Sequence, residues 1–520
     1  MPTPAVSSRH AYYLLSALHR EGVVILLSGF ATCPGLFYAT PAQDGILSRI
    51  RIPGGILDSK QCHAIADIAD QYGGGYVDVT NRANLQVREI RTGINATILK
   101  NLQDVGLGAR NPAVDHIRNI MTSPTAGIDP QELIDTRPLI QSWDNYIVEH
   151  PALSGLSAKF SVGFDGGGTV SVCDRLNDIM FAAVLVDNRV YFRLCLSFGL
   201  QGEPPIDTGI LLLPEQCLPV LAALAAVYLN HSDPDSRRKL RLRELLNSLG
   251  CDTYLQQVIQ QLTFPLFRSN LTSVQTEELP EKSDTKHRHI GIHPQYQPGL
   301  FYIGVVLPLG RLEGQQIRGL ADLAAKYGSG TLRLTPWQNL LLTDIPQQLV
   351  RDVESKIASL GLDFSTKNIN SALVACSGIR GCAASATDTK GDALTLVKYL
   401  ATRVSLNHPI NIHFSGCKKS CAQHSKSDIT LLGVSQESET GSSPAYDIYV
   451  GKGDSNQKLG DEIYQHVNIA QLPILVGQML QVYKIHSKNP DETFREFVNR
   501  HDIAQLKQLF SPTCREKILF

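Results

Sequence analysis

Two stretches of 33 residues decide the fold: PGGILDSKQCHAIADIADQYGGGYVDVTNRANL, residues 53–85, and PLGRLEGQQIRGLADLAAKYGSGTLRLTPWQNL, residues 308–340. They align without a gap at a constant offset of 255 residues, and 13 of the 33 aligned pairs are identical. Likeness at a fixed period is the sequence signature of a repeated structural unit. The chain is therefore predicted to contain two copies of one module.

Each copy predicts a strand, a helix and a second strand. The first strand ends at a Pro-x-Gly turn, and in the first copy Asp58 and Gln61 have the spacing of a capping box that begins a helix. Apolar residues recur at helical spacing until Gly73 and Gly328, where a C-terminal glycine is expected to end the helix. Each unit of about 65 residues is too small to bury a core alone. The two copies are therefore expected to pack against each other or against the segments that follow them.

The rest of the chain divides around the two copies. The polar, charged stretch at residues 269–289 is typical of a linker. The sequence thus predicts an α+β protein with pseudo-twofold organisation, in which two half-domains alternate with two larger α+β domains. The expected bounds are 1–32 for a variable N-terminal extension, 33–105 for half-domain 1, 106–268 for the first large domain, 269–294 for the linker, 295–360 for half-domain 2 and 361–520 for the second large domain.

Composition narrows the class of protein. The chain of 520 residues is 43% hydrophobic and 19% charged, with a net charge of −1, which favours neither a nucleic-acid binder nor a membrane-surface protein. The longest apolar run, residues 22–31, has about half the length that a bilayer crossing needs, and no A-x-A-like cleavage site follows it. The 11 cysteines are odd in number and four of them cluster, which does not predict a disulfide framework. A reducing, cytoplasmic compartment is expected.

Charge divides unequally between the two copies. The first copy carries Arg49, Arg51, Arg82 and Arg88, where the aligned residues of the second are Gly304, Val306, Trp337 and Thr343. Guanidinium groups are suited to carboxylates and small oxyanions. The first half is therefore predicted to bind an anionic ligand, although a face of surface arginines would give the same pattern.

The four clustered cysteines belong to the second half alone. Cys376-x5-Cys382 and Cys417-x3-Cys421 lie in stretches rich in glycine and small residues, CSGIRGCAAS and SGCKKSCA, which let the backbone approach a bulky inorganic group. Structural zinc normally uses two to four residues between paired ligands, so the x5 spacing counts against it. Disulfides are rare in a reducing compartment. A [4Fe–4S] cluster tolerates varied spacing, and zinc stays open as an alternative on spacing alone.

With the repeat, the arginines and the cysteine pairs together, the chain resembles the sulfite/nitrite reductase superfamily from about Cys33 onward. The resemblance implies two ferredoxin-like half-domains alternating with two sulfite-reductase-type domains. It implies that the four cysteines ligate a [4Fe–4S] cluster and that Cys421 also bridges to a tetrapyrrole iron. It implies catalytic roles for Arg88, Arg118 and Lys159, and contacts to the tetrapyrrole for Arg49, Arg51 and Arg82.

Within the superfamily four stretches most resemble the precorrin-3B synthases, and they fall at residues 33–55, 159–168, 381–394 and 415–433. Nitrite reductases usually have Pro-Asn after the third cysteine, where this chain has Lys418-Lys419. Sulfite reductases generally place a second lysine at the position of Ser161, so sulfite reduction is disfavoured. The C-terminal stretch DETFREFVNRHDIAQLKQLF resembles ferredoxin-dependent nitrite reductases instead.

Two activities follow from the resemblance. In the first, the tetrapyrrole is the substrate, and the protein hydroxylates precorrin-3A with oxygen and closes a lactone in cobalamin biosynthesis, using the cluster and a mononuclear non-haem iron. In the alternative, the tetrapyrrole is a siroheme cofactor and the protein is a ferredoxin-nitrite, less readily a sulfite, reductase. A non-catalytic iron–sulfur carrier is a third class. No GxGxxG follows a strand, so electrons are expected from an external donor such as ferredoxin or an NAD(P)H-linked reductase.

Overall fold

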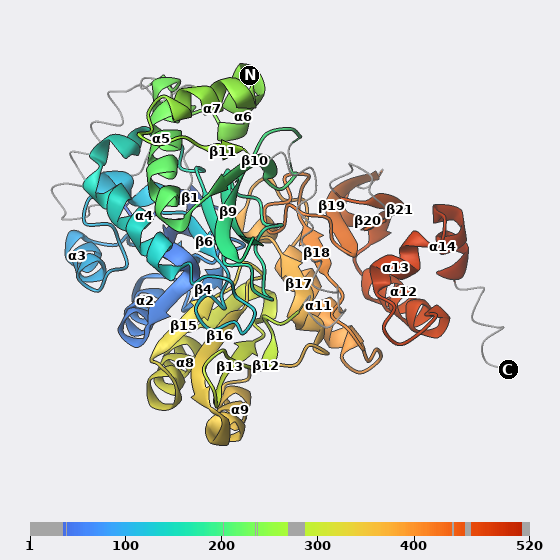
Figure 1. Ribbon diagram of the computed structural model, residues 1–520. Helices are drawn as coiled ribbons and strands as arrows, with labels where there is room; N and C mark the ends of the chain where they lie inside the picture. The colour runs from blue at the N-terminus through green and yellow to red at the C-terminus, as the bar shows by residue number, and fades with distance from the viewer. Residues whose placement is uncertain are drawn as a thin grey trace.

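The structure is a computed structural model, and it describes residues 35–511 apart from 38, 201, 234–235, 237, 269–286, 439–440 and 453–458. The predicted N-terminal extension and most of the predicted linker lie outside these described residues. Within them the chain forms four β-sheets, two in the half-domains and two in the larger domains, each accompanied by helices. The predicted fold class, a duplicated α+β protein, is confirmed (Figure 1). The domain bounds given above stay predictions.

The two half-domains have matching elements. In the first copy these are β1 (Thr40–Ala42), β2 (Gly45–Ile50), η1 (Pro53–Gly55), β3 (Ile56–Asp58), α2 (Ser59–Tyr72), β4 (Tyr76–Val79), β5 (Leu85–Ile90) and α3 (Ala96–Asp104). In the second they are β12 (Gly291–Pro294), β13 (Leu300–Val305), η6 (Pro308–Gly310), β14 (Arg311–Glu313), α8 (Gly314–Tyr327), β15 (Thr331–Leu334), β16 (Leu340–Pro346), η7 (Gln347–Leu349) and α9 (Val350–Ser359). Because β12 pairs with β13, the last residues of the predicted linker are an edge strand of the second sheet.

A reciprocal exchange of strands joins the two half-domains. The first sheet has the order β1-β2-β5-β4-β14, so its last strand comes from the second copy. The second sheet has the order β12-β13-β16-β15-β3, so its last strand comes from the first copy. Arg311 faces Asp78 in one exchanged pair, and Ile56 faces Arg333 in the other. Each copy therefore completes the other's sheet, which goes further than the packing of two copies that the sequence predicted.

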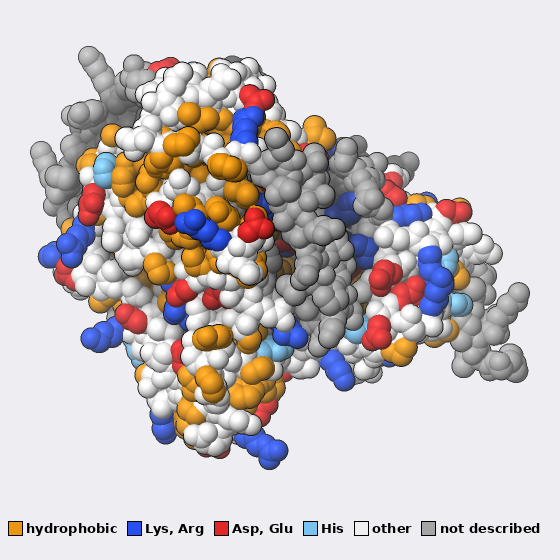
Figure 2. All heavy atoms as spheres, in the orientation of Figure 1, with side chains coloured by type: hydrophobic (Ala, Val, Ile, Leu, Met, Phe, Trp, Pro, Cys, Tyr) orange, Lys and Arg blue, Asp and Glu red, His pale blue; other side chains and the backbone are white. Residues whose placement is uncertain are grey.

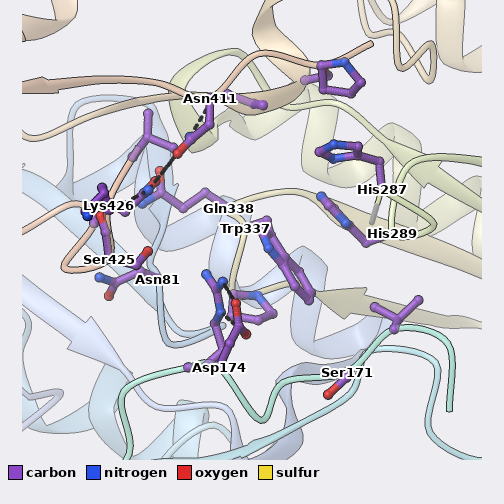
Figure 3. A pocket seen from close by; sticks show the side chains of 18 of the residues that line it. Asn81, Ser171, Asp174, His287, His289, Trp337, Gln338, Asn411, Ser425 and Lys426 are labelled. Atoms are coloured by element: carbon purple, nitrogen blue, oxygen red, sulfur yellow. Dashed lines mark hydrogen bonds and ion pairs between the residues drawn. The ribbon is translucent and has the colours of Figure 1, made fainter. Parts of the chain in front are cut away.

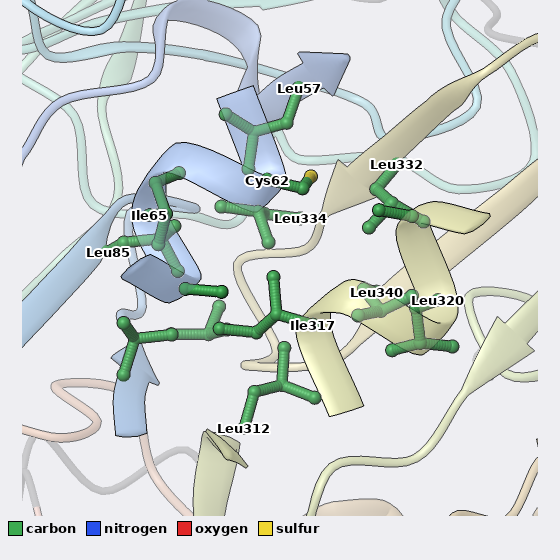
Figure 4. Packing of buried hydrophobic residues seen from close by; sticks show 14 of the residues in the cluster. Leu57, Cys62, Ile65, Leu85, Leu312, Ile317, Leu320, Leu332, Leu334 and Leu340 are labelled. Carbon is green, nitrogen blue, oxygen red and sulfur yellow. The ribbon is translucent and has the colours of Figure 1, made fainter. Parts of the chain in front are cut away.

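One hydrophobic core serves both half-domains. Helices α2 and α8 contact each other beneath the two sheets, and Ile65 and Leu320 from these helices are fully buried (Figure 4). Cys62 of α2 belongs to the same core, where burial raises the pKa of its thiol to about 12. This cysteine is therefore a packing residue and no ligand.

The helix ends follow the sequence signals, with one difference. Asp58 accepts a hydrogen bond from the Gln61 N–H, and the Gln61 side chain accepts one from the Asp58 N–H, so the predicted capping box is present. Gly73 and Gly328 end their helices, but with φ of −101° and −131° neither adopts the left-handed conformation of a C-terminal glycine cap. Glycine is needed there for space, because a Cβ at Gly73 would lie 2.8 Å from Val87 Cγ1.

The two larger domains repeat one another as well. The first contains η2 (Pro112–Ile117), β6 (Ile120–Thr122), α4 (Arg137–Glu149), η3 (Pro151–Gly155), β7 (Val162–Asp165), β8 (Ile179–Val186), β9 (Arg189–Leu196), β10 (Ile206–Leu212), η4 (Pro214–Gln216), α5 (Cys217–Asn230), α6 (Leu242–Leu249), α7 (Cys251–Ile259) and β11 (Phe267–Arg268). The second contains η8 (Ile369–Ala372), β17 (Leu373–Ala375), α10 (Gly378–Gly381), α11 (Thr389–Leu400), β18 (Ile412–Ser415), β19 (Ile429–Ser438), β20 (Gly441–Val450), β21 (Asp461–Asn468), α12 (Leu472–His486), α13 (Phe494–Asn499) and α14 (Ile503–Leu509).

In each large domain the first two strands run parallel to the third, and the fourth is antiparallel. Parallel neighbours bring the loops at their carboxyl ends to one edge of the sheet, where α/β folds commonly bind ligands. These edges are the first place to look for a functional site.

The described surface is mixed in character. On the face shown in Figure 2, acidic and basic side chains are interspersed, and hydrophobic side chains gather over the first large domain. No helix within the described ranges is long and apolar enough to cross a bilayer.

Candidate active site

The four clustered cysteines lie at the carboxyl edge of the second large sheet. Cys376 directly follows β17, and Cys417 lies two residues after β18, the parallel neighbour of β17. The Cys376 N–H donates to the Phe414 carbonyl at 3.1 Å, which holds the two loops side by side. Cysteines that are distant in sequence are therefore brought together because their strands are parallel neighbours whose carboxyl ends meet at one edge.

Local turns bring the second cysteine of each pair back to the first. The short helix α10 reverses the chain after Cys376 and so brings Cys382 back towards it. The Cys382 N–H donates to the Gly378 carbonyl at 2.9 Å. Ser420, with φ of 56°, closes the turn between Cys417 and Cys421. Burial raises the pKa of the Cys421 thiol, and the thiols of the other three cysteines raise it further. All four are free cysteines, and Cys376 and Cys421 line one cavity.

The four cysteines and the packing of their loops bear on which metal group they would hold. Four cysteine thiols are the usual ligand set of a [4Fe–4S] cluster. Glycine lets the loops that carry them pack closely, because a Cβ at Gly416 would overlap Ser385 and one at Gly378 would lie 2.7 Å from the Thr389 nitrogen. The residues therefore fit a [4Fe–4S] cluster.

Equivalent hairpin loops of the two half-domains donate hydrogen bonds to the loop that carries Cys417 and Cys421. From the β4–β5 loop, Asn81 Nδ2 donates to the Cys421 carbonyl at 3.3 Å. From the β15–β16 loop, Gln338 Nε2 donates to the Ala422 carbonyl at 3.2 Å. Ala83 and Gln338, which are aligned by the 255-residue offset, both have positive φ, at 52° and 62°. Equivalent loops of the two half-domains thus both contact the cysteine loop.

A cavity of about 240 Å³ lies between half-domain 1 and the cysteines. Cys376 and Cys421 form one wall, and the other walls carry cationic side chains. These are Arg49, Arg82, Arg88 and Lys390. Three of these four cations come from the first half, as the sequence predicted, and they meet the thiols of the second half in one cavity, whereas Lys390 comes from the second half.

A larger cavity of about 730 Å³ adjoins the small one, and the two share Asn81, Arg82, Gln338 and Ala422 in their linings (Figure 3). It lies between the loop after β7 and the loop after β18, the corresponding edges of the two large sheets. Its volume is in the range of cofactor pockets. Cationic side chains line it, namely Arg82, Arg175, Arg288, Lys426 and Arg495. A tetrapyrrole with several carboxylates fits such a lining.

Trp337 forms part of the wall of the larger cavity. It stacks on His289 with ring centroids 4.3 Å apart, and the Arg175 guanidinium lies 5.2 Å from its ring centre (Figure 3). Trp337 occupies the position aligned with Arg82. At equivalent positions, the first copy thus places a guanidinium group in the wall of the larger cavity and the second copy places an indole there. Burial lowers the pKa of His289 well below its usual value, so this ring is neutral within the stack.

The arginines and the lysine predicted to be catalytic are not gathered at one point. Arg88 lines the small cavity, but its guanidinium is paired with Asp44 at 2.8 Å and donates to the Gly381 carbonyl at 3.0 Å. Arg118 is buried in an ion pair with Asp144 at 2.7 Å and lines neither cavity described above. Lys159 is exposed and also lies outside both linings.

Of the residues predicted to contact the tetrapyrrole, Arg49 and Arg82 line the small cavity and Arg51 does not. Arg51 is 1% exposed and lies near His116, whose pKa is lowered by burial and, to a lesser degree, by the Arg51 charge. Arg82 Nη1 donates to Asn177 Oδ1 at 2.7 Å, which aims its guanidinium into the site. Arg82 alone among the predicted arginines lines both cavities.

The sequence did not predict Lys390, Asn81 or Gln338 as site residues. The two amides lie in equivalent hairpin loops but not at aligned positions, because the 255-residue offset pairs Asn81 with Pro336 and Gln338 with Ala83. Lys390 sits within a stretch quoted for its resemblance, TDTKGDAL, but nothing in the spacing assigned it a role.

The duplicated fold, the four-cysteine edge and the basic cavities define an α+β redox-cofactor protein. Family models agree: the nitrite/sulfite reductase ferredoxin-like half domain matches residues 40–105 and 293–360, and the nitrite and sulphite reductase 4Fe-4S domain matches residues 113–266. The chain belongs to the nitrite/sulfite reductase family.

Relatives named as nitrite reductases cover most of the chain. It is 31% identical to a ferredoxin–nitrite reductase of Leptolyngbya laminosa over 87% of this chain and 90% of that protein. It is 29% identical to the chloroplastic ferredoxin–nitrite reductase of Zea mays, over 86% and 80%, and 29% identical to an assimilatory ferredoxin-dependent nitrite reductase of Haloferax mediterranei, over 89% and 83%. Among solved structures, the Mycobacterium tuberculosis NirA protein has the same fold, with a TM-score of 0.73 at 24% identity over 89% of this chain and 84% of that one.

These relatives bear on the choice between the two activities. They favour the alternative, nitrite reduction, over the precorrin-3B synthase activity that the four quoted stretches favoured. Two of those stretches, residues 381–394 and 415–433, contribute Lys390, Cys421 and Ala422 to the cavity walls, which both activities would share, so they do not separate the two.

Proposed function

We propose that the protein is a nitrite reductase that uses a [4Fe–4S] cluster and siroheme and takes its electrons from a ferredoxin-like donor. One observation carries this proposal: Cys421 lies where the cysteine edge opens on two adjoining cavities with cationic walls. The relatives named above, ferredoxin–nitrite reductases, support the same activity.

Each group has a place in the chain. Cys376, Cys382, Cys417 and Cys421 would hold the cluster, and the adjoining cavities would hold siroheme through carboxylate contacts to their arginines and lysines. Siroheme, when bound, supplies the iron at which nitrite is reduced by six electrons to ammonium. Arg82 would bind the nitrite anion or a siroheme carboxylate, since it lines both cavities.

Arg88 has a positioning role in this proposal. Its bidentate pair with Asp44 is 5% and 13% exposed, and its bond to the Gly381 carbonyl reaches the residue before Cys382. Removing one partner of such a buried pair is destabilising by about 3–5 kcal/mol. Arg88 would therefore hold half-domain 1 against the cluster loop. For Arg118 and Lys159 a catalytic role stays a prediction.

Ser161, which stands where sulfite reductases generally have a lysine, favours nitrite over sulfite as the substrate. Its N–H and hydroxyl both donate to Asp178 Oδ2, at 3.0 and 3.2 Å, and the residue is buried. A lysine at this position, as in sulfite reductases, would break that network. Ser161 carries no ammonium group, so the chain lacks the second lysine that sulfite reductases generally place at this position.

The electron donor would approach the cysteine edge. Arg380, Lys418 and Lys419 are exposed within or beside the cysteine pairs, and Ile379 is 51% exposed among them. A donor with an acidic surface, as ferredoxins have, is complementary to this surface. The Lys418-Lys419 pair is the chain's own departure from the nitrite reductase pattern.

The test separates nitrite reduction from tetrapyrrole oxidation. Purified, cluster-reconstituted protein is examined anaerobically by visible spectroscopy, and bound pigment is extracted with acid. Siroheme in the extract, with ammonium formed from nitrite and a reduced donor, is the expected result. Iron–sulfur absorption without pigment, and oxygen-dependent conversion of precorrin-3A, would replace this proposal with the synthase activity. Cys417→Ser should lose the cluster iron, whereas Cys251→Ser, on α7, should retain it.

A further inference from the structure

Lys390 is the cation of the small cavity that the sequence did not single out. It is the second residue of α11, and the start of this helix is tied to the cysteine loop because Thr389 Oγ1 donates to the Cys376 carbonyl at 2.7 Å. Its side chain is 16% exposed and lines the cavity together with Cys376 and Cys421. The position of its ammonium group is therefore fixed relative to the four thiols.

Lys390 Nζ meets groups from both half-domains. It donates to Asp78 Oδ1 at 2.8 Å and to the Leu309 carbonyl at 3.4 Å. Asp78 also accepts from Arg311, at 3.0 Å from Nε and 3.3 Å from Nη2. Lys390, Asp78 and Arg311 thus form one cluster of charges at the junction of three modules, and we name it the junction triad.

The junction triad has unequal charge. Two cations share one carboxylate, so a net charge of +1 remains beside the thiols. The pKa of Lys390 is lowered by burial, raised by Asp78 and lowered further by the charges of Arg311 and Arg88, with a net shift downward. Burial raises the pKa of Asp78, but Lys390 and Arg311 together hold it below its usual value. Keeping charges in such a place costs free energy of desolvation.

Asp78, the acidic residue of the junction triad, has no acidic counterpart in the second copy of the repeat. The position aligned with Asp78 in the second copy is Arg333, which donates to the carbonyls of Pro124 and Ala126 in the first large domain. That domain has no cysteine pair at the matching edge. The two copies therefore carry opposite charges at the position whose side chain binds Lys390 in the first copy.

We propose that Lys390 is a positioning cation that sets the reduction potential of the iron–sulfur cluster, because its ammonium faces the cavity that Cys376 and Cys421 line. The proposal rests on the proposed function, which supplies the cluster. A cluster held by thiolates gains one negative charge on reduction, and a cation close by in surroundings of low polarity stabilises that form. Asp78 moderates the effect and holds the ammonium in place.

The experiment is a reductive titration of the full-length holoprotein, followed by electron paramagnetic resonance of the reduced cluster. Lys390→Met should move the midpoint potential to more negative values, and Lys390→Arg should keep it near that of the wild type. Lys398→Met removes an exposed lysine from the same helix and should leave the potential unchanged. A Lys390→Met protein with an intact cluster and the wild-type potential would overturn the proposal.

A second variant separates charge from packing and serves if Lys390→Met fails to fold. Asp78→Asn leaves both cations but removes the carboxylate, so the potential should move to more positive values. Opposite shifts of the midpoint potential in the two variants are expected if charge is the cause. Damage to packing would not be expected to shift the potential in opposite directions. A negative shift, or none, in Asp78→Asn would contradict the proposal. Absence of a cluster signal in the wild type would instead refute the proposed function, and this inference with it.

Discussion

The backbone N–H of Gly416 donates a hydrogen bond to Cys376 Sγ over 3.3 Å, and so joins the two cysteine loops directly. The bond holds the Cys376 sulfur against the loop that carries Cys417 and Cys421. The bond depends on residue 416 being glycine, because a Cβ there would overlap the Ser385 hydroxyl.

Gly416→Ala should therefore lose the cluster without losing the fold. The added methyl would push the loop away from Ser385 and lengthen the bond to Cys376 Sγ. We expect iron and acid-labile sulfide in the purified protein to fall by more than half, measured beside far-ultraviolet circular dichroism. Ser385→Gly in the same chain removes the obstacle and should restore most of the iron. Iron content equal to that of the wild type in Gly416→Ala would show that the loop adapts and that the bond is dispensable.

Arg82→Ala should lower the rate of nitrite reduction by about 10²-fold, the usual effect of removing one donor to an anionic centre. The residue lines both cavities, so siroheme content should be measured in the same samples. Arg82→Lys keeps the charge but not the planar fork, and we expect an intermediate rate. If Arg82→Ala retained full activity and pigment, the site would have to lie elsewhere in the cavities.

Exchange of Lys418 and Lys419 for glutamate should raise the KM for reduced ferredoxin by on the order of tenfold at low ionic strength. The difference should narrow as salt is added, because exposed charges are screened. A small artificial donor such as reduced methyl viologen should be used equally by both proteins. The charge-matched control is Lys60→Glu with Lys100→Glu, two exposed lysines of half-domain 1, and equal effects in both double variants would remove the case for docking at the cysteine edge.

Stability should fall as the pH rises towards 8, in part because of Glu132. Burial raises the pKa of this carboxyl to about 8 from 4.5, and nearby acidic groups add to the effect. Between these values the folded state keeps a proton that the unfolded state releases, so this contribution is complete below about pH 4.5 and is lost as the pH passes 8. Glu132→Gln should flatten the pH dependence of the urea midpoint between about pH 5.5 and 8. Glu149→Gln, at the exposed end of α4, should not.

Much of the architecture could be predicted because local signals agree with the global fold. The Asp58 capping box, the apolar spacing of α2 and α8 and the grouping of the four cysteines all depend on residues close in sequence or on the duplication. The strand exchange was not predicted, since β3 and β14 are only three residues long and their partners lie in the other copy.

The site was harder to predict from the sequence, because its contacts join residues that are far apart in the chain. Arg118 was assigned a catalytic role from its charge and its matching motif, but its pairing with Asp144, 26 residues further on, is a tertiary contact. Lys390 reaches Asp78 across 312 residues of chain. A sequence shows which side chains are charged, whereas the partner that holds each charge emerges only when distant segments pack.

The exchange of β3 and β14 also orders the events of biosynthesis. Half-domain 1 cannot complete its sheet until Arg311–Glu313 has been synthesised, and the wall of the cavity that bears Cys421 comes more than 100 residues later still. A ribosome-bound chain therefore exposes an unfinished sheet edge from the end of β4 at Val79 to the end of β14 at Glu313, an interval of 234 residues, and we expect chaperone contact during that interval. Because Cys421 is residue 421 of 520, we expect insertion of iron and pigment to be a late step.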